Sequence, residues 1–358
     1  MRVDLRHTAS VRRSPALALF LALALACSPA GSSSDTGAGP TDTGASSSGG
    51  IIIPPTSTST GGIDPTTGPA EKYDLPEQKD MGDLSPGCGA VDILFVIDNS
   101  KSMGQFQAAL ADAFPQFVDA MIANLPEKVS LHVGITTTDF YCTDAGGNCC
   151  PDTCPVGNTL CTIGSTPEEI EALKTFYNPP TNGDNGVNGS QGRLFTHEGM
   201  SFFAANTSDD PAPLKAWFTG AAVAAGEQGS SIEMPVAAAG FATSDINAAT
   251  NAGFVRDTDA ILLIIFLTND PDASLESLKT YEEMVLAAKK NCPECILTAG
   301  LLKPCVPAEN QRLWQFMTAF GDKPIWGDID DKANYAKTVG KALASTLTEA
   351  CINIPPVG

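Results

Sequence analysis

One carboxylate and two hydroxyls stand at alternate positions in the segment 98–102, DNSKS. A single tight turn can bring the side chains of Asp98, Ser100 and Ser102 together. All three offer oxygen ligands, which suit a hard cation, particularly Mg²⁺ with its bound waters and open positions. Asp and Ser are also common N-caps, so capping of a following helix is the alternative function of this segment.

The segment lies between a predicted strand and a predicted helix. VDILFVI at 91–97 is a short apolar run, typical of a strand that is buried on both faces. Residues 103–125 carry apolar side chains at helical spacing. In an open parallel sheet, ligands bind beyond the carboxyl ends of strands at the topological switch point. The candidate oxygens therefore follow a strand at a position where ligands bind.

Strands and helices alternate along the rest of the chain. Further strands are predicted at 129–138, 260–268 and 295–301, and further helices at 234–241, 275–290, 308–320 and 332–348. Strands that are separated by helix-length segments indicate an α/β fold with a doubly wound, mostly parallel sheet flanked by helices.

The segment 93–103, ILFVIDNSKSM, resembles the opening of von Willebrand factor A (VWA) domains, in which DxSxS begins the metal-ion-dependent adhesion site. The resemblance extends over about 91–348 and includes the order of strands and helices. It implies a Rossmann-like fold and a metal site built from three loops. It also implies Mg²⁺, or Mn²⁺ or Ca²⁺, as cofactor, and a partner whose acidic group completes the coordination of the metal.

The second metal loop implied by the resemblance is GSSIE at 229–233. The family places a Thr after a glycine here, at the start of a helix, and Ser230 aligns with that Thr. A serine hydroxyl can do the same chemistry. The alternative is a glycine-containing turn in which Ser230 caps the helix at 234–241.

The third metal loop follows the predicted strand at 260–268, and here the chain departs from the family pattern. Asn269 stands where the family usually has Asp directly after Thr. Asn269 can coordinate through its carbonyl oxygen or hold a metal-bound water, but it brings no charge. We therefore expect weakened cation affinity, with Asp270 or Asp272 as the candidate for compensation.

The first 26 residues are predicted to be a lipoprotein signal peptide. Four arginines precede the apolar run 16–26, which is too short to span a bilayer. ALAC at 24–27 resembles the lipobox of bacterial lipoproteins, which implies cleavage before Cys27 and lipid attachment to it; an ordinary secretory signal is the alternative. Ser28 after the cysteine indicates the outer membrane of a Gram-negative bacterium, by resemblance to lipoproteins there.

Residues 27–86 are rich in Ser, Thr, Gly and Pro and lack helical or alternating periodicity, so we predict a disordered tether. The VWA-like domain then covers 87–352. Segments 129–140 and 192–199 resemble a bacterial branch of the family that is found on lipoproteins. We therefore expect an exported protein that is anchored in the cell envelope by the lipid on Cys27.

Ten cysteines remain besides Cys27, an even number that suits disulfides in an oxidising compartment. The long insertion at about 140–200 is predicted to be disulfide-rich and to overhang the carboxyl-end site, with zinc binding as the alternative for its cysteines. CPEC at 292–295 follows a helix and enters a strand, which favours a structural bridge over a redox pair. A bridge between Cys88 and Cys351 would close a fold whose termini lie close together. The ten are Cys88, Cys142, Cys149, Cys150, Cys154, Cys161, Cys292, Cys295, Cys305 and Cys351.

Charge and motif content favour binding to a ligand over nucleic-acid binding or catalysis. The chain has 21 basic and 41 acidic residues, and a net charge of -20 opposes contact with phosphates. His132 and His197 belong to no recognisable catalytic spacing. Two hypotheses follow: a cation-dependent adhesion or ligand-capture domain, or a metal-free structural envelope protein in which Asn269 marks the loss of the metal.

Overall fold

The computed structural model describes residues 89–140, 187–321 and 324–341, with isolated positions in 171–181 and at 347 and 350. All of them belong to the unit Pro76–Gly358. No helix among the described residues is long and apolar enough to cross a membrane. The predicted signal peptide and tether and most of the insertion lie outside the described residues, as do Cys27, Cys88, Cys142, Cys149, Cys150, Cys154, Cys161 and Cys351.

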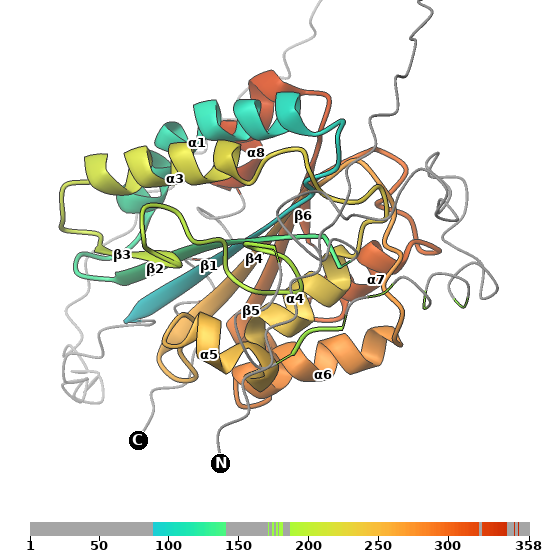
Figure 1. The fold of residues 1–358 in the computed structure, drawn as a ribbon. Coiled ribbons are helices and arrows are strands. Elements are labelled where there is room, and N and C mark those ends of the chain that lie inside the picture. The colour runs from blue at the N-terminus through green and yellow to red at the C-terminus, as the bar shows by residue number, and fades with distance from the viewer. Residues whose placement is uncertain are drawn as a thin grey trace, which may run out of the picture. The chain divides into compact units, whose positions relative to one another are not determined.

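Within the described residues, six strands form one sheet in the order β3-β2-β1-β4-β5-β6 (Figure 1). All neighbours pair in parallel except β3, which is antiparallel to β2 at one edge. Strand numbers rise outward on both sides of β1, so the order reverses between β1 and β4, the place where such sheets bind ligands. The strands are β1 (Ala90–Ile97), β2 (Ser130–Thr137), β3 (Phe202–Asn206), β4 (Ala260–Thr268), β5 (Ile296–Leu302) and β6 (Ile325–Asp328).

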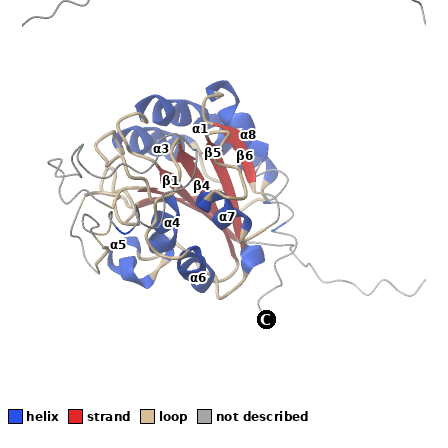
Figure 2. Ribbon diagram, turned by 90° about the vertical axis from the view of Figure 1, so that its right-hand side faces the viewer, coloured by secondary structure: helices blue, strands red, loops and turns tan. Residues whose placement is uncertain are grey.

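Helices cover both faces of the sheet, which confirms the predicted doubly wound α/β class (Figures 1 and 2). One face carries α1 (Gly104–Asn124), α3 (Ala212–Ala224) and α8 (Tyr335–Lys341). The opposite face carries α4 (Pro235–Thr243), the short α5 (Ala248–Asn251), α6 (Leu278–Ala288) and α7 (Arg312–Thr318). Three 3₁₀ turns complete the described elements: η1 (Asp245–Asn247), η2 (Pro293–Cys295) and η3 (Lys332–Asn334).

The central strand is buried on both sides, as its apolar sequence predicts. Phe95 enters the core beneath α1, whereas Leu94 and Val96 enter the core beneath α4. The predicted strands correspond to β1, β2, β4 and β5, and the predicted helices to α1, α4, α6 and α7. The last predicted helix begins instead as η3 and continues as α8. We did not predict β3, β6 or α3.

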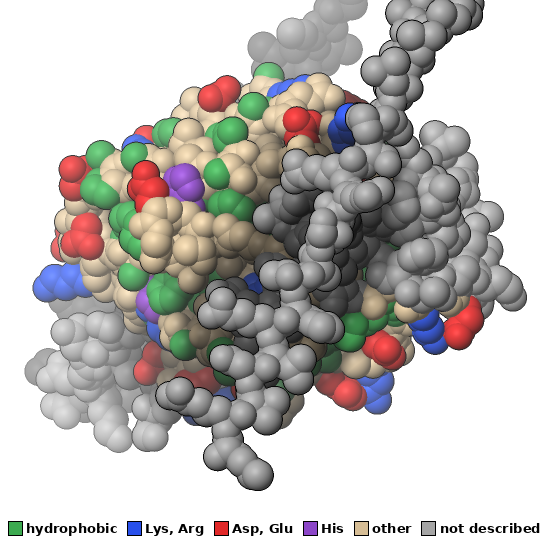
Figure 3. Space-filling model, in the orientation of Figure 1, with side chains coloured by type: hydrophobic (Ala, Val, Ile, Leu, Met, Phe, Trp, Pro, Cys, Tyr) green, Lys and Arg blue, Asp and Glu red, His purple; other side chains and the backbone are tan. Residues whose placement is uncertain are grey.

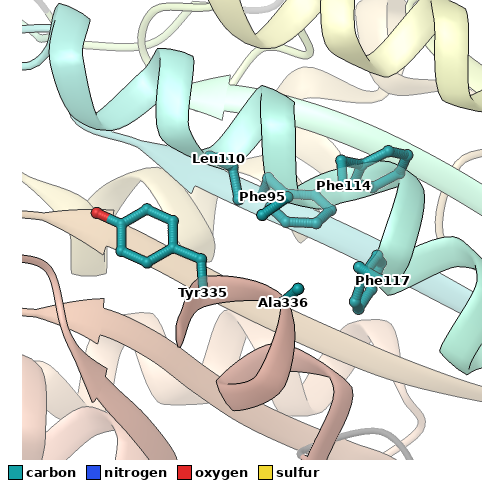
Figure 4. Close-up of a pocket in the computed structure, with 7 residues that line it drawn as sticks. Phe95, Leu110, Phe114, Phe117, Tyr335 and Ala336 are labelled. Atoms are coloured by element: carbon teal, nitrogen blue, oxygen red, sulfur yellow. The ribbon is translucent and has the colours of Figure 1, made fainter. Parts of the chain in front are cut away.

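Aromatic packing fixes α1 over the sheet. The ring of Phe95 lies 5.9 Å from Phe114 and 4.5 Å from Phe218 of α3, measured between centroids. Figure 4 shows Phe95 beneath α1, with Tyr335 of α8 on the other side of a cavity of about 10 Å³. Its apolar walls and small volume favour a dry cavity. Because α1 is held here, the turn that precedes it is held as well.

A disulfide joins Cys292 and Cys295, whose Cα atoms are 5.3 Å apart. It lies in η2, between α6 and the start of β5, as predicted for a structural bridge. The start of a parallel strand is at the opposite edge of the sheet from the carboxyl ends. Cys305 is also disulfide-bonded.

Replacing Phe95 by Ala tests the packing that holds α1. We expect a loss of about 3–5 kcal/mol in the free energy of unfolding, because a fully buried ring at the meeting point of three other rings leaves a cavity. Urea unfolding followed by tryptophan fluorescence measures it. Val223→Ala on α3 is the control, since that side chain is 52% exposed, and it should change stability by less than about 0.5 kcal/mol. A loss below about 1 kcal/mol in Phe95→Ala would contradict this account.

Candidate metal centre

The turn after β1, residues 98–103 (loop 1), brings the three predicted side chains together. Asp98 is fully buried, and its Oδ1 accepts a hydrogen bond from the backbone N–H of Ser100 at 2.9 Å. The hydroxyl oxygens of Ser100 and Ser102 lie 3.4 Å apart. The backbone closes the turn with a bond of 3.0 Å from Met103 N to Ser100 O. The spacing in DNSKS therefore places these oxygens within one turn, as expected.

The helix-capping alternative for loop 1 is wrong. Met103 occupies the N-cap of α1 and makes no side-chain capping bond. The first N–H of the helix, on Gly104, donates instead to Glu227 Oε1 at 3.0 Å, from a segment far away in the sequence. The serine hydroxyls of loop 1 are therefore not used to cap α1 and can serve a ligand.

The segment 268–272 (loop 3), which begins at the last residue of β4, is bonded directly to loop 1. Ile97 and Leu267 are partners in the β1–β4 register, so Asp98 and Thr268 leave the sheet side by side. Thr268 Oγ1 donates to Asp98 Oδ2 at 2.9 Å. Asn269 Nδ2 donates to Ser102 Oγ at 3.0 Å. The structure thus brings Asn269 to the serines of loop 1.

The segment 226–233 (loop 2) contacts loop 1 through its backbone. Gly229 N donates to Asn99 O at 2.9 Å. A Cβ on Gly229 would lie 2.4 Å from Asn99 Oδ1, so any other residue here would force the side chain of Asn99 to move. Gln107 Nε2 joins the two loops further, since it donates to Asp98 O at 3.0 Å and to Gly226 O at 2.8 Å.

The hydroxyl of Ser230 is engaged within its own loop. It donates to Ile232 O at 3.1 Å and accepts from Ile232 N at 3.3 Å. The backbone N–H of Ser230 faces Asp139 Oδ1 at 3.5 Å. The structure places Ser230 in the loop that meets loop 1, and its service as a metal ligand stays a prediction.

The capping alternative for Ser230 is also wrong. Met234 is the N-cap of α4 and makes no side-chain capping bond. Val236 N donates to Asp272 Oδ1 at 3.1 Å, and Arg312 Nε donates to Asp272 Oδ2 at 3.0 Å. Asp272 therefore stabilises the start of α4. Asp270 is the other acid that could compensate for Asn269, and its carboxylate makes no hydrogen bond or ion pair among the described contacts.

Three acidic side chains at this edge of the sheet have raised pKa values, chiefly because they are buried. Burial raises the pKa of Asp98, against the effect of its hydrogen-bond donors. Burial, and then the charge of Asp98, raise the pKa of Asp270 to about 7, while Lys303 opposes this. Burial, followed by the charge of Asp98, raises the pKa of Glu233 well above its usual range. The field at the site therefore favours a positive charge.

We did not single out Glu233 from the sequence. The residue is only 2% exposed, and its Oε2 accepts a hydrogen bond from the hydroxyl of Thr138, directly after β2. A sequence signal existed, because Glu233 stands between Ile232 and Met234 just before a wholly buried helix. A carboxylate in such an apolar segment is costly to bury and often marks a functional site.

Unpaired buried oxygens provide a test of whether a metal fits here. Asn99 Oδ1, Glu233 Oε1 and Asn269 Oδ1 are buried and have no hydrogen-bond partner among the described residues. They come from loops 1, 2 and 3 in turn. Buried polar atoms are nearly always paired, and a hard cation pairs with oxygens of this kind. The residues present therefore fit a cation such as Mg²⁺.

The donor set has to include neutral oxygens. Within the described ranges, no group of three or more His, Cys, Asp or Glu side chains is placed to hold a metal ion. A cation here would thus rely on hydroxyl and amide oxygens in addition to carboxylates. Mg²⁺ tolerates such a set because it retains several waters.

The end of the insertion packs beside the site. Thr137 N, the last residue of β2, donates to Gly189 O at 2.8 Å, and Gln191 N donates to Asp139 O at 2.9 Å. Asn251 Nδ2 holds the same segment through Gly192 O at 2.9 Å. Residues 189–192 therefore lie at the carboxyl end of β2. Most of the insertion that we predicted to overhang the site lies outside the described ranges.

Two solved structures are similar to this chain at a low level. A von Willebrand factor type A protein from Catenulispora acidiphila is 14% identical, with a TM-score of 0.33 and coverage of 72% of this chain and 43% of that one. Proximal thread matrix protein 1 from the mussel byssus is 9% identical, with a TM-score of 0.37 and coverage of 74% and 49%. The chain thus spans less than half the length of either. No family profile and no curated protein matches the sequence. These values assign neither a family nor a function to the chain.

Proposed function

We propose that this protein carries a VWA-type domain that binds a divalent cation, Mg²⁺ or else Mn²⁺ or Ca²⁺, and through it an acidic group of a protein or other ligand. The observation that carries the proposal is the pair of side-chain bonds between loops 1 and 3, Thr268 to Asp98 and Asn269 to Ser102. They gather oxygen ligands at the switch point of the sheet, the place where folds of this class bind ligands. The sequence resemblance of 93–103 and the strand order support the VWA assignment.

We propose binding rather than catalysis as the activity of this site. His132 lies within β2, where its Nδ1 is 2.8 Å from Phe254 O and 3.6 Å from Asp92 Oδ1. The ring of His197 faces Trp217 of α3 at 6.4 Å between centroids. Both histidines are thus engaged away from loop 1, so the chemistry available at the site is that of oxygen ligands.

A nucleic-acid partner is not part of this proposal. On the face drawn in Figure 3, lysine and arginine side chains are scattered rather than gathered into a patch. With a net charge of -20, the protein would repel a phosphate backbone. A carboxylate of a partner would instead reach the site by completing the shell of the bound cation.

We further propose that the domain is exported and anchored to the outer membrane through lipid on Cys27, with 27–86 as its tether. The disulfide between Cys292 and Cys295 supports an oxidising compartment. In that position the domain would act as a ligand-capture or adhesion module at the cell envelope.

A metal-free structural envelope protein is the second candidate. Two observations favour it: the hydroxyl of Ser230 bonds within its own loop, and Asn269 brings no charge to loop 3. A protein of this kind would keep the fold and the loop contacts without a cation.

A cation titration separates the two candidates. We expect the melting temperature to rise by several degrees in saturating Mg²⁺, because a ligand at 100 times its Kd stabilises the folded state by about 2.7 kcal/mol. Asp98→Asn should abolish the rise, since it removes a central charge while it keeps the shape of the side chain. Asp112→Asn, on the exposed side of α1, is the matched control and should respond like the wild type. If Mg²⁺, Mn²⁺ and Ca²⁺ all leave the wild-type melting temperature unchanged, the structural candidate is favoured.

The raised pKa values predict how the metal-free protein responds to pH. The unfolded chain loses the proton of Asp270 near its ordinary pKa of 3.8, whereas the folded protein keeps it until about 7. The folded state therefore binds more protons between these values, and its stability should fall as pH rises from about 4 to 7. Urea unfolding in EDTA at several pH values measures the slope, which should be smaller in Asp270→Asn. Equal slopes in the two proteins would show that Asp270 does not carry the effect.

A further inference from the structure

We infer that Glu233 supplies the negative charge that the cation site lacks because residue 269 is Asn. This inference rests on the proposed function and assigns a charge-providing residue to the same site. Loop 2 then contributes two groups to the site, the carboxylate of Glu233 and the hydroxyl predicted at Ser230.

The backbone holds Glu233 between the end of β2 and the segment that follows loop 3. Met234 N donates to Thr138 O at 3.1 Å, which ties loop 2 to the end of β2. Ala273 N donates to Glu233 O at 2.8 Å, which ties loop 2 to the segment that follows loop 3. Two bonds on either side of one residue fix its Cα at the carboxyl edge of the sheet.

The side chain of Glu233 has one oxygen engaged and one free for a ligand. Its Oε2 accepts from the hydroxyl of Thr138, and its Oε1 is buried with no hydrogen-bond partner among the described residues. Asn269 Oδ1, in loop 3, is likewise buried with no hydrogen-bond partner among the described residues. The Ala273–Glu233 bond joins loop 2 to the segment after loop 3, and a shared cation would satisfy one unpaired oxygen from each loop.

In the described part of the chain, no basic side chain forms an ion pair with the acids of the site. Glu233, Asp98 and Asp270 form no ion pair there, and Lys303 is paired with Asp330 at 2.6 Å. A buried carboxylate without a partner is strongly unfavourable. A divalent cation would remove this penalty for both Asp98 and Glu233.

Charge counting explains why a second carboxylate is needed. The hydroxyls of Ser100 and Ser102 and the amide oxygen of Asn269 are neutral, so Asp98 alone would leave a dication half neutralised. Asp270 is the other candidate for the second charge, but among the described residues it has no buried unpaired oxygen, whereas Glu233 has one. Affinity for such cations depends on the number of charged ligands. Glu233 restores the count that an acid at 269 would provide.

The experiment exchanges the two positions. Mg²⁺ affinity is measured by calorimetry, and Mg²⁺-induced thermal shift by calorimetric scanning, for the full chain and the variants Glu233→Gln, Asn269→Asp and the double variant. We expect Glu233→Gln to weaken Mg²⁺ binding on the order of 10–100-fold. Asn269→Asp should strengthen it, and the double variant should return to about the wild-type value because it again holds two carboxylates. Asp112→Asn, an exposed acid on α1 outside the three loops, is the matched control and should leave affinity unchanged.

Each contrary result has a distinct meaning. Wild-type affinity in Glu233→Gln overturns the inference and leaves the proposed function intact. Weakened binding in Glu233→Gln that Asn269→Asp does not restore overturns the charge argument, because Glu233 then acts only by holding β2 and loop 3 together. Should Glu233→Gln fail to fold, unchanged affinity in Asn269→Asp alone overturns the inference. No Mg²⁺ binding by the wild type overturns both the inference and the proposed function.

Discussion

The structure depends on a carboxylate that is buried at the end of its central strand. Asp98 is kept there by the backbone N–H of Ser100 on one oxygen and the hydroxyl of Thr268 on the other. Removing a charge from water is costly unless donors or a cation compensate it. The loops after β1 and β4 supply these donors. Glu233 increases the electrostatic cost, because its carboxyl group is also buried and the charge of Asp98 acts on it.

The two hydrophobic cores, one on each face of the sheet, fix the positions of these loops. Beneath α1, the rings around Phe95 fix the helix that loop 1 leads into. On the other face, the buried residues of α4 pack against the sheet and fix the end of loop 2. Neither helix is capped by the side chains of the turn before it; Glu227 bonds the start of α1 and Asp272 the start of α4. Acids from distant segments thus accept hydrogen bonds from the backbone N–H groups at the starts of α1 and α4. The oxygens of loop 1 therefore remain available for a ligand.

Prediction from sequence succeeded where burial on both faces leaves a continuous apolar run, as in β1 and β4. It missed β3 and β6, because an edge strand is short and partly exposed and owes its conformation to the neighbour that it pairs with. Helix α3 was missed although Leu214, Trp217 and Ala221 recur at helical spacing, so that signal was present in the sequence. Ser230 was placed in the right loop, but the direction of its hydroxyl follows from the turn geometry.

The sequence by itself determined the fold class, the Cys292–Cys295 bridge and the meeting of Asp98, Ser100 and Ser102, because each depends on periodicity or on atoms a few residues apart. Only the tertiary structure decided which distant atoms join them. The β1–β4 register sets Thr268 beside Asp98, and the close approach at Gly229 sets loop 2 against Asn99. Such contacts arise from the packing of whole elements. No local pattern encodes the position of Glu233 beside Thr138, which lies 95 residues earlier in the chain.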